Sequence, residues 1–449
     1  MEDVLLAWTE VGTRSECGKF RIFKVPVGYE FQRSVTPGFG EMSIFKHPLK
    51  SKIVVKKFSG IFHVIDDALR IMREVKLLTR LQCDHVLRID DMHITEDVLD
   101  LYIVQQFMCA DLARIIACQR LNVHEEQYFM YNILCGLTYI HSADVMHCDV
   151  RPEHVLINAN DEVKLCDFSM ARRISAAVAC DREDEVPLSE YCDFSWYSAP
   201  EMKLIPSRYT QAVDLWSSGL ILAHMIGREP LFAGENAWNQ LTNIFSVLGV
   251  VPADLDSIPL ESRSRSFIEQ LPVSEKRPWS SVLPTATLQA AELLDRLICV
   301  HPVRRAAAKD ALESGFFCAL HDPDDVSEAA SHFDWSFDDG RPTSSFIEME
   351  LSRECQRMQQ SRLICLRVSA VAGDDSVVLY CHDMSGEAVA STSVQPGQRV
   401  GDIRKIVCEI IDERPESLLF ITSAGQELRD ADQLGMETFL DHMDDISCK

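Results

Sequence analysis

The period of the hydrophobic pattern changes near residue 64, and this change limits the possible folds more than any other feature. Between residues 20 and 60, apolar and polar residues alternate on both sides of a Gly-containing turn at 36–41, which is typical of an antiparallel sheet. Residues 64–82 repeat apolar side chains at helical spacing, and helical patterns dominate from Asp111 to His301. The sequence therefore predicts an α+β protein with a small β-rich lobe followed by a larger helical lobe.

The chain continues well beyond this helical region. With 449 residues it is expected to form two or three domains. The composition becomes acidic and poorly periodic at 321–345, and a short helix is expected at 344–360. Strand-like runs then follow at 363–370, 376–382, 388–394 and 417–422, with a helix expected at about 400–412. These runs predict a second, small α/β domain.

Charge and cysteine content narrow the class of protein. There are 44 basic and 69 acidic residues, a net charge of −25, which disfavours nucleic-acid and anionic-membrane partners and favours basic ones. The 16 cysteines form no CxxC pair, which is typical of reduced thiols inside a cell. No apolar run approaches the roughly 20 residues of a membrane span. A cytoplasmic or nuclear protein is expected, with neither a nucleic-acid nor a membrane partner.

Four charged residues occur in the order that phosphate transfer requires. This reaction needs a group that holds the phosphates, metal charge near the transferring oxygens and a carboxylate near the attacking hydroxyl. Lys56 lies late in a predicted strand, and Glu74 on the next predicted helix could pair with it and aim it. Asp149 and Asp167 each follow an apolar segment. Each residue alone would be ordinary, and it is the motifs around them that are specific.

Those motifs resemble a eukaryotic protein kinase and, within that superfamily, a mitogen-activated protein kinase. The matching landmarks are Ile53-Val-Val-Lys56, Glu74, His141-Ser-Ala-Asp-Val-Met-His147, Asp149, Asp167-Phe168, Trp196-Tyr-Ser-Ala-Pro-Glu201, Asp214-Leu-Trp-Ser-Ser-Gly219 and Arg305. Ser189-Glu-Tyr191 stands where this family carries its Thr-x-Tyr activation site, and residues 230–275 resemble the family's insert. The resemblance implies a bilobal kinase domain at 20–318.

The implied domain has an N-lobe at about 20–107 and a C-lobe at about 108–318, after an N-terminal extension at 1–19. Residues 319–362 are then an acidic docking segment and C-terminal extension of the kinase. Residues 363–449 resemble a ubiquitin-like β-grasp domain, and the alternative of another small α/β domain stays open. The chain ends at Lys449 without a Gly-Gly pair. A docking or autoregulatory role with an unknown partner is therefore expected, rather than conjugation.

The resemblance also implies roles for single residues, with ATP and Mg²⁺ as cofactors. Asp149 would accept the hydroxyl proton, Arg151 would lie near the transferred phosphate, and Asp167 and His154 stand at the metal positions. The implied nucleotide-binding residues are Gly38, Gly40, Lys56, Phe107, Met108, Asp111 and Leu156. A monomer is expected. The upstream kinase and protein substrates would bind at an acidic patch that contains Asp322 and Asp325. An ordinary solvated acidic loop remains the alternative for this patch.

Several positions depart from the family pattern where phosphate and metal are held. The glycine turn is shifted in register, with Pro37 removing an amide and Glu41 adding a negative charge. His154 replaces an Asn that offers a carbonyl oxygen, although Mg²⁺ strongly prefers oxygen ligands. Ser169 replaces the Gly that follows Asp167-Phe168, which restricts the backbone. These changes predict weakened metal and nucleotide binding.

The residues that bind phosphate on the activation loop are altered as well. Cys148 replaces the Arg that precedes the catalytic Asp, a change also found in active dual-specificity tyrosine-regulated kinases. Ser195 and Ser198 stand where two arginines would bind the phosphate of Tyr191, which needs cationic partners. Arg70 and Arg73, on the helix of Glu74, could still meet a phosphorylated Ser189. We therefore expect phosphorylation of Ser189 to matter and that of Tyr191 to matter little.

Two functions follow from different classes of protein. The first is an active serine/threonine kinase, because all four charged positions are retained. The second is a pseudokinase scaffold that binds signalling partners with little or no phosphate transfer, because the glycine turn and the metal position of His154 are altered.

Overall fold

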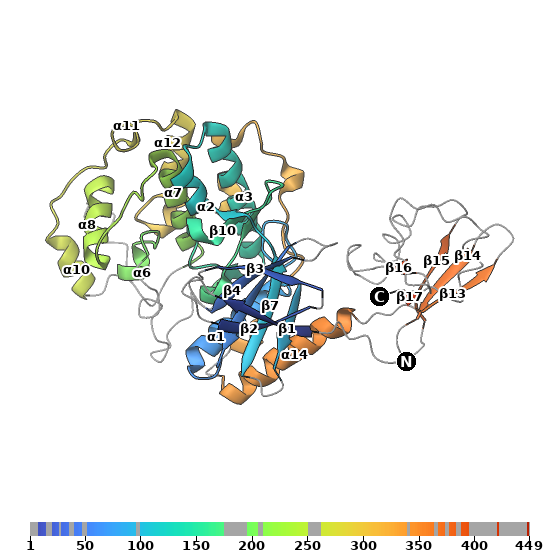
Figure 1. Ribbon diagram of the computed structural model, residues 1–449. Helices are drawn as coiled ribbons and strands as arrows, with labels where there is room; N and C mark the ends of the chain where they lie inside the picture. Colours follow the sequence, from blue (N-terminus) through green and yellow to red (C-terminus); the bar gives the residue numbers. More distant parts are fainter. Residues whose placement is uncertain are drawn as a thin grey trace. The chain divides into compact units, whose positions relative to one another are not determined.

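The computed structural model describes most of the first 362 residues and five short strands after them (Figure 1). The described residues are 8–14, 20–26, 28–35, 40–46, 52–95, 99–174, 195–204, 210–249, 262–338, 342–362, 367–372, 377–382, 388–394, 420–421 and 447–448. The chain forms two compact units, one of Thr9–Leu351 and one of Met1–Trp8 with Ser352–Lys449. Nothing in the described part is a helix long and apolar enough to cross a membrane.

The first lobe of the larger unit is built on a five-stranded antiparallel sheet in the order β3-β4-β5-β7-β6. Its strands are β3 (Glu30–Val35), β4 (Glu41–Lys46), β5 (Ile53–Ser59), β6 (Asp91–Ile94) and β7 (Asp100–Gln106). A two-stranded sheet of β1 (Trp8–Arg14) and β2 (Phe20–Pro26) precedes it. Alternation at 20–60 thus predicted strands correctly, and β5 pairs with β7 so that Lys56 lies opposite Ile103.

Helix α1 (Ile65–Leu78) is the helix that the apolar spacing at 64–82 predicts. It buries Ile71, Met72 and Val75, so its apolar side chains form part of the lobe's core. Glu74 lies among them and is only 3% exposed, which requires a partner for its charge. Helix α1 therefore brings a carboxylate into the interior of the lobe.

The second lobe is mainly helical. Its helices are α2 (Leu112–Cys118), α3 (Val123–Ser142), α6 (Glu201–Leu204), α7 (Ala212–Gly227), α8 (Ala237–Leu248), α10 (Ser262–Glu269), α11 (Trp279–Val282), α12 (Leu288–Leu297) and α13 (Ala308–Leu312). Helix α3 begins with a reciprocal capping box, in which Asn122 and Glu125 satisfy each other's backbone amides. Helix α3 is buried over its second half, α7 is almost entirely buried, and Trp216 of α7 is fully enclosed. They form the rigid base beneath the loops that follow.

Short elements on either side of α3 carry the motif residues. They are β8 (Ala110–Asp111), β9 (Val145–Met146), η1 (Pro152–His154), β10 (Val155–Ile157), β11 (Val163–Leu165), η2 (Phe168–Met170) and β12 (Arg172–Arg173). Strands β11, β10 and β8 form one sheet, and β12 pairs with β9. Cys148 and Asp167 adopt left-handed backbone angles, with φ of 67° and 61°. The loops around β9 and β11 are therefore sharply turned next to buried strands.

The segment after α13 forms short helical turns and one long helix, although its sequence at 321–345 is acidic and poorly periodic. It contains η4 (Gly315–Phe317), η5 (Pro323–Asp325), η6 (Ser336–Asp338) and the helix α14 (Ser344–Arg362), whereas η3 (Pro302–Arg304) lies before α13. Trp335 and Phe337 stack with ring centroids 5.9 Å apart, and both are buried. Asp338 and Glu350 form ion pairs with Arg73 and Lys76 of α1. This segment therefore anchors helix α1 from outside the first lobe.

The smaller unit contains a sheet in the order β15-β14-β13-β17-β16. Its strands are β13 (Arg367–Ala372), β14 (Val377–His382), β15 (Ala388–Val394), β16 (Phe420–Ile421) and β17 (Ser447–Cys448). The first four fall within the predicted strand-like runs or overlap them, whereas the alternation did not predict β17. The helix expected at about 400–412 lies outside the described residues, so the ubiquitin-like fold stays a prediction.

Candidate active site

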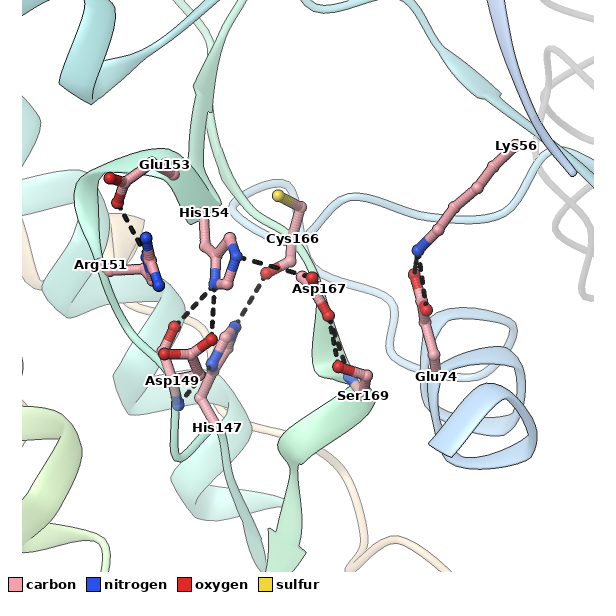
Figure 2. Close-up of polar contacts among 10 residues, drawn as sticks. All are labelled: Lys56, Glu74, His147, Asp149, Arg151, Glu153, His154, Cys166, Asp167 and Ser169. Atoms are coloured by element: carbon pink, nitrogen blue, oxygen red, sulfur yellow. Dashed lines mark hydrogen bonds and ion pairs between the residues drawn. The ribbon is translucent and has the colours of Figure 1, made fainter. Parts of the chain in front are cut away.

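A buried ion pair joins strand β5 to helix α1. Lys56 Nζ donates to both carboxylate oxygens of Glu74, at 2.9 and 3.0 Å, and the two side chains are 9% and 4% exposed (Figure 2). Burial alone would lower the pKa of Lys56, but the charges of Glu74 and Asp167 outweigh it, and the pKa lies above its ordinary value. Lys56 is thus a cation that Glu74 fixes in place and whose charge Asp167 also stabilises. This is the ion pair that the order of the sequence motifs predicts.

Asp214, near the start of α7, holds the backbone of the loop that carries Asp149. Its carboxylate is about 1% exposed and accepts the backbone amides of His147 and Cys148, each at 2.8 Å. His141 Nε2 lies 2.9 Å from the same carboxylate. These contacts offset the strain of the left-handed Cys148. The sequence identified Asp214 only as a motif residue, without a role. A carboxylate near the start of a mostly apolar helix could have indicated a structural role.

His147 ties the two aspartate-bearing loops together. Its ring is fully buried, and burial lowers its pKa below the ordinary value. Nε2 lies 3.0 Å from the carbonyl oxygen of Cys166, while Nδ1 accepts the amide of Asp149 at 3.3 Å. The ring also contacts Phe168, with centroids 4.7 Å apart. A neutral His147 with its proton on Nε2 therefore fixes the residues before Asp167 relative to Asp149.

The side chain of His154 lies between the two aspartates (Figure 2). Its Nδ1 is 2.8 Å from the backbone carbonyl oxygen of Asp149 and 3.3 Å from Oδ2 of the same residue. Its Nε2 is 3.5 Å from Asp167 Oδ2. One imidazole therefore contacts both carboxylates that the sequence singles out. The structure brings together all three residues predicted for proton transfer and metal binding.

Ser169 also acts on Asp167. Its hydroxyl donates to Asp167 Oδ1 at 2.6 Å, and its backbone amide lies 3.3 Å from the same oxygen. Burial would raise the pKa of Asp167, but Lys56, His154 and the Ser169 hydroxyl outweigh it, and the pKa lies well below its ordinary range. Asp167 is therefore a stable carboxylate with one oxygen held by Ser169 and the other facing His154.

Arg151 pairs with a neighbour on its own loop. Its Nε donates to Glu153 Oε2 at 2.9 Å, and both side chains are partly exposed, at 31% and 45%. An exposed pair of this kind is weak and easily broken. Arg151 is therefore able to turn toward a bound phosphate, and Glu153 is the residue that competes for it. Sequence reasoning did not assign a role to Glu153.

The residues predicted to contact the nucleotide are only partly described. Gly40 has a φ of 81°, and an added Cβ would lie 2.9 Å from the carbonyl oxygen of Lys57, so only glycine fits there. Asp111 caps α2 by accepting the Arg114 amide at 2.7 Å, and it lies opposite Leu156 in the β8–β10 pair. Met108 is buried, and the ring of Phe107 lies 5.3 Å from Lys52 Nζ. Gly38, Ser189 and Tyr191 lie outside the described residues.

The comparisons with known proteins agree with this geometry. The protein kinase domain family matches residues 36–317. Mitogen-activated protein kinase 2 of Pneumocystis carinii is 36% identical over 313 residues, which cover 69% of this chain and 88% of that protein. Mitogen-activated protein kinase HOG1 of Hortaea werneckii is 35% identical over 302 residues, which cover 67% and 81%. The chain belongs to the mitogen-activated protein kinase family. It is an ATP-dependent serine/threonine protein kinase, and kinases of this family use ATP with Mg²⁺.

The two predicted metal positions of this kinase fit magnesium unequally. Asp167 offers a carboxylate oxygen, which suits Mg²⁺, whereas His154 offers nitrogen, which does not. Within the described ranges, no three His, Cys, Asp or Glu side chains converge into a site that would hold a metal alone. A cation here therefore needs ligands from the nucleotide, as is usual for Mg²⁺ in kinases.

Away from the aspartates, the kinase has a large pocket at helices α2 and α3. Its volume is about 1150 Å³, and its apolar lining includes Ile115, Phe129, Ile157 and Leu320. Leu320 lies just before the acidic turn of Asp322 and Asp325, both of which are exposed. The hydroxyl of Tyr131 on α3 donates to the Asp322 carbonyl oxygen at 3.2 Å. Helix α3 therefore lines this pocket and also contacts the predicted acidic patch.

The two arginines of α1 that were expected to meet a phosphorylated Ser189 already lie next to carboxylates. Arg73 donates to both oxygens of Asp338, at 2.8 to 3.0 Å, and these side chains are 11% and 15% exposed. Arg70 lies 3.7 Å from Asp67 on the same helix. The expectation that Arg70 and Arg73 face a phosphorylated Ser189 therefore requires a phosphate to compete with Asp338.

Proposed function

We propose that this kinase is catalytically active, with Lys56, Glu74, Asp149 and Asp167 in the roles that their positions suggest. The observation that carries the proposal is the buried Lys56–Glu74 ion pair, with Asp167 near enough to act on the charge of Lys56. Breaking a buried ion pair costs several kcal/mol, so this arrangement is well determined. A scaffold without phosphate transfer has no need of a lysine held in this way.

In the proposed mechanism, Lys56 binds the nucleotide phosphates and Glu74 keeps its ammonium group in place. Bound Mg²⁺ supplies positive charge that offsets the charge on the transferring oxygens. Asp167 provides the carboxylate that holds it. Asp149 accepts the proton of the attacking serine or threonine hydroxyl, and His154, bonded to the Asp149 carbonyl oxygen, keeps that loop in position. Arg151 leaves Glu153 to contact the transferred phosphate.

Transfer of radiolabelled γ-phosphate to a basic protein substrate tests this proposal. The purified wild type is expected to label the substrate, and the Asp149→Asn variant is expected to lose this activity. An Asp310→Asn variant is a matched control, because Asp310 is an exposed carboxylate on α13 that does not line the pocket at α2 and α3. Label that persists in Asp149→Asn would indicate a contaminating kinase. Absence of transfer by the wild type with both Mg²⁺ and Mn²⁺ would support the scaffold function instead.

For substrate recruitment, we propose that one peptide occupies the pocket at α2 and α3 and the acidic turn together. The pocket provides apolar surface at Ile115 and Phe129, and the adjacent turn carries the exposed carboxylates Asp322 and Asp325. A basic cluster joined to spaced apolar side chains has the complementary chemistry. Upstream kinases and substrates that carry such a segment would then be held at a surface separate from the aspartates.

Binding of a fluorescent peptide with this composition tests the docking surface. The Asp322→Asn/Asp325→Asn variant is expected to weaken binding by about tenfold, because two charge pairs of about 0.5–1 kcal/mol each are lost. It should raise the KM for a substrate that carries the peptide and leave kcat unchanged. Glu328→Gln, which removes an exposed carboxylate paired with Lys309, is the control. Equal affinity in the double variant and the wild type would exclude the acidic turn.

For the smaller unit, the ubiquitin-like interpretation is kept as a proposal. It is supported by the strands β13, β14 and β15 and by their mutual antiparallel pairing. A docking or autoregulatory role for this unit, and a cytoplasmic or nuclear location of the kinase, are parts of the same proposal. Comparing the kcat/KM of the full chain with that of a chain ending at Arg362 measures any autoregulation directly.

A further inference from the structure

The surroundings of His154 point to a cation other than magnesium at the second metal position. We propose that His154 Nε2 and Asp167 Oδ2 together bind a divalent first-row transition cation, such as Mn²⁺, which nucleotide phosphates complete. The inference rests on the proposed function, because it places this cation in the nucleotide site of the kinase. It makes His154 a residue that determines which metal the enzyme selects.

The first observation concerns the tautomer of His154. Its Nδ1 lies 2.8 Å from the backbone carbonyl oxygen of Asp149, and a carbonyl oxygen can only accept a hydrogen bond. Nδ1 therefore carries the hydrogen, and in the neutral ring the lone pair is on Nε2. Histidines that bind metals almost always donate their other ring N–H to a carbonyl or carboxylate oxygen, which fixes the ring. His154 thus has the outer partner that a metal ligand needs.

The second observation concerns the direction and spacing of the two ligand atoms. Nε2 faces Asp167 Oδ2 at 3.5 Å, whereas the other oxygen, Oδ1, is held by the Ser169 hydroxyl at 2.6 Å (Figure 2). Two ligands that bind one ion at about 2.0–2.2 Å with angles of about 90–110° lie roughly 2.8–3.6 Å apart. Ser169 therefore leaves free the oxygen that is spaced to share an ion with His154.

The donor set decides the class of cation. Magnesium strongly prefers oxygen ligands and gives up its water reluctantly. Transition cations accept imidazole nitrogen beside carboxylate and phosphate oxygen, and their affinity for such sites is higher. Because the two protein ligands alone do not make a complete site, binding should depend on the nucleotide, and the protein without nucleotide should bind the cation weakly.

Pulsed electron paramagnetic resonance on the full chain tests this inference without any phosphate transfer. The protein is labelled with ¹⁵N-histidine and loaded with Mn²⁺ and unlabelled ADP. The wild type should show the coupling of a directly coordinated ¹⁵N nucleus, and His154→Asn should lose it. His332→Asn, the same change at an exposed histidine, should keep it. In parallel, His154→Asn should shift the ratio of Mn²⁺ to Mg²⁺ affinity, measured with ADP, by about tenfold toward Mg²⁺.

Each outcome decides the question. Mn²⁺–ADP bound to the wild type without nitrogen coupling overturns the inference and leaves the kinase function intact, as does coupling that persists in His154→Asn. If neither cation binds with ADP, both the inference and the proposed function fail. Because the coupling is first sought in the wild type, a poorly folded His154→Asn would not remove the test, and His154→Gln then provides the comparison.

Discussion

Replacement of Glu74 by Gln is the most direct perturbation of the proposed catalytic machinery. Gln has nearly the same shape and keeps one acceptor for Lys56, but it removes the negative charge and one of two charged hydrogen bonds, at 2.9 and 3.0 Å. A hydrogen bond to a charged group contributes about 1.5–3 kcal/mol. Lys56 would then be drawn to Asp167, the other carboxylate that acts on its charge. Phosphate binding and metal binding would both suffer.

A loss of about 3 kcal/mol of transition-state stabilisation corresponds to a decrease in kcat/KM of about 150-fold. Steady-state phosphate transfer to a basic substrate measures this decrease. The matched control is Glu350→Gln. Glu350 is also buried and pairs with Lys76, which lies on α1 as Glu74 does, but Glu350 is outside the proposed catalytic machinery. Glu350→Gln should lower the melting temperature and keep kcat/KM within about threefold of wild type.

The two variants together separate positioning of Lys56 from general support of helix α1. If Glu350→Gln lowered kcat/KM as much as Glu74→Gln, the loss would reflect displacement of α1 and not loss of the Lys56 contact. If Glu74→Gln kept wild-type kcat/KM, Lys56 would not need this carboxylate, and the reasoning about the ion pair would be refuted.

Three further predictions concern the metal carboxylate, a titrating side chain and the core. Ser169→Gly removes the 2.6 Å hydrogen bond to Asp167 and should strengthen Mg²⁺–ADP binding severalfold in calorimetric titration. Burial raises the pKa of Glu126 to about 7, so the folded state binds more protons than the unfolded state. The free energy of unfolding should therefore fall as pH rises from about 4.5 to 7. Glu126→Gln should abolish this pH dependence in thermal unfolding. Glu201→Gln leaves the buried Arg305 without its carboxylate, which should cost about 3–5 kcal/mol and lower the melting temperature by roughly 5 °C or more.

The Lys56–Glu74 pair shows what sequence reasoning could predict. Alternation identified β5, helical spacing identified α1, and the order of the two elements made their charged residues natural partners. Both elements are regular, so residue spacing along the chain determines where side chains point, although β5 is buried on both faces. Asp149 and Asp167 each follow an apolar segment that the structure buries, but the motifs around them, and not residue spacing, singled them out.

The contacts of His154 could not be predicted in this way. They depend on a left-handed Asp167 and on loops that Asp214 and His147 hold from other elements, so no periodicity along the chain encodes them. The ion pair between Arg73 and Asp338 joins residues 265 positions apart and was missed for the same reason. The sequence suggested that Arg73 could meet a phosphorylated Ser189, which lies outside the described residues, whereas its contact in the structure is with Asp338.

The contacts of Asp214 and Asp338 bear on how the proposed activity would be controlled by phosphorylation. Asp214 binds the backbone amide of Cys148, a group that is present whatever side chain stands at 148. Asp338 neutralises Arg73 on α1, a charge that would otherwise favour an activation-loop phosphate. Helix α1, and Glu74 with it, is thus held by contacts that need no phosphate. We therefore expect the altered positions at Cys148, Ser195 and Ser198 to change how the activity is controlled and not to abolish it.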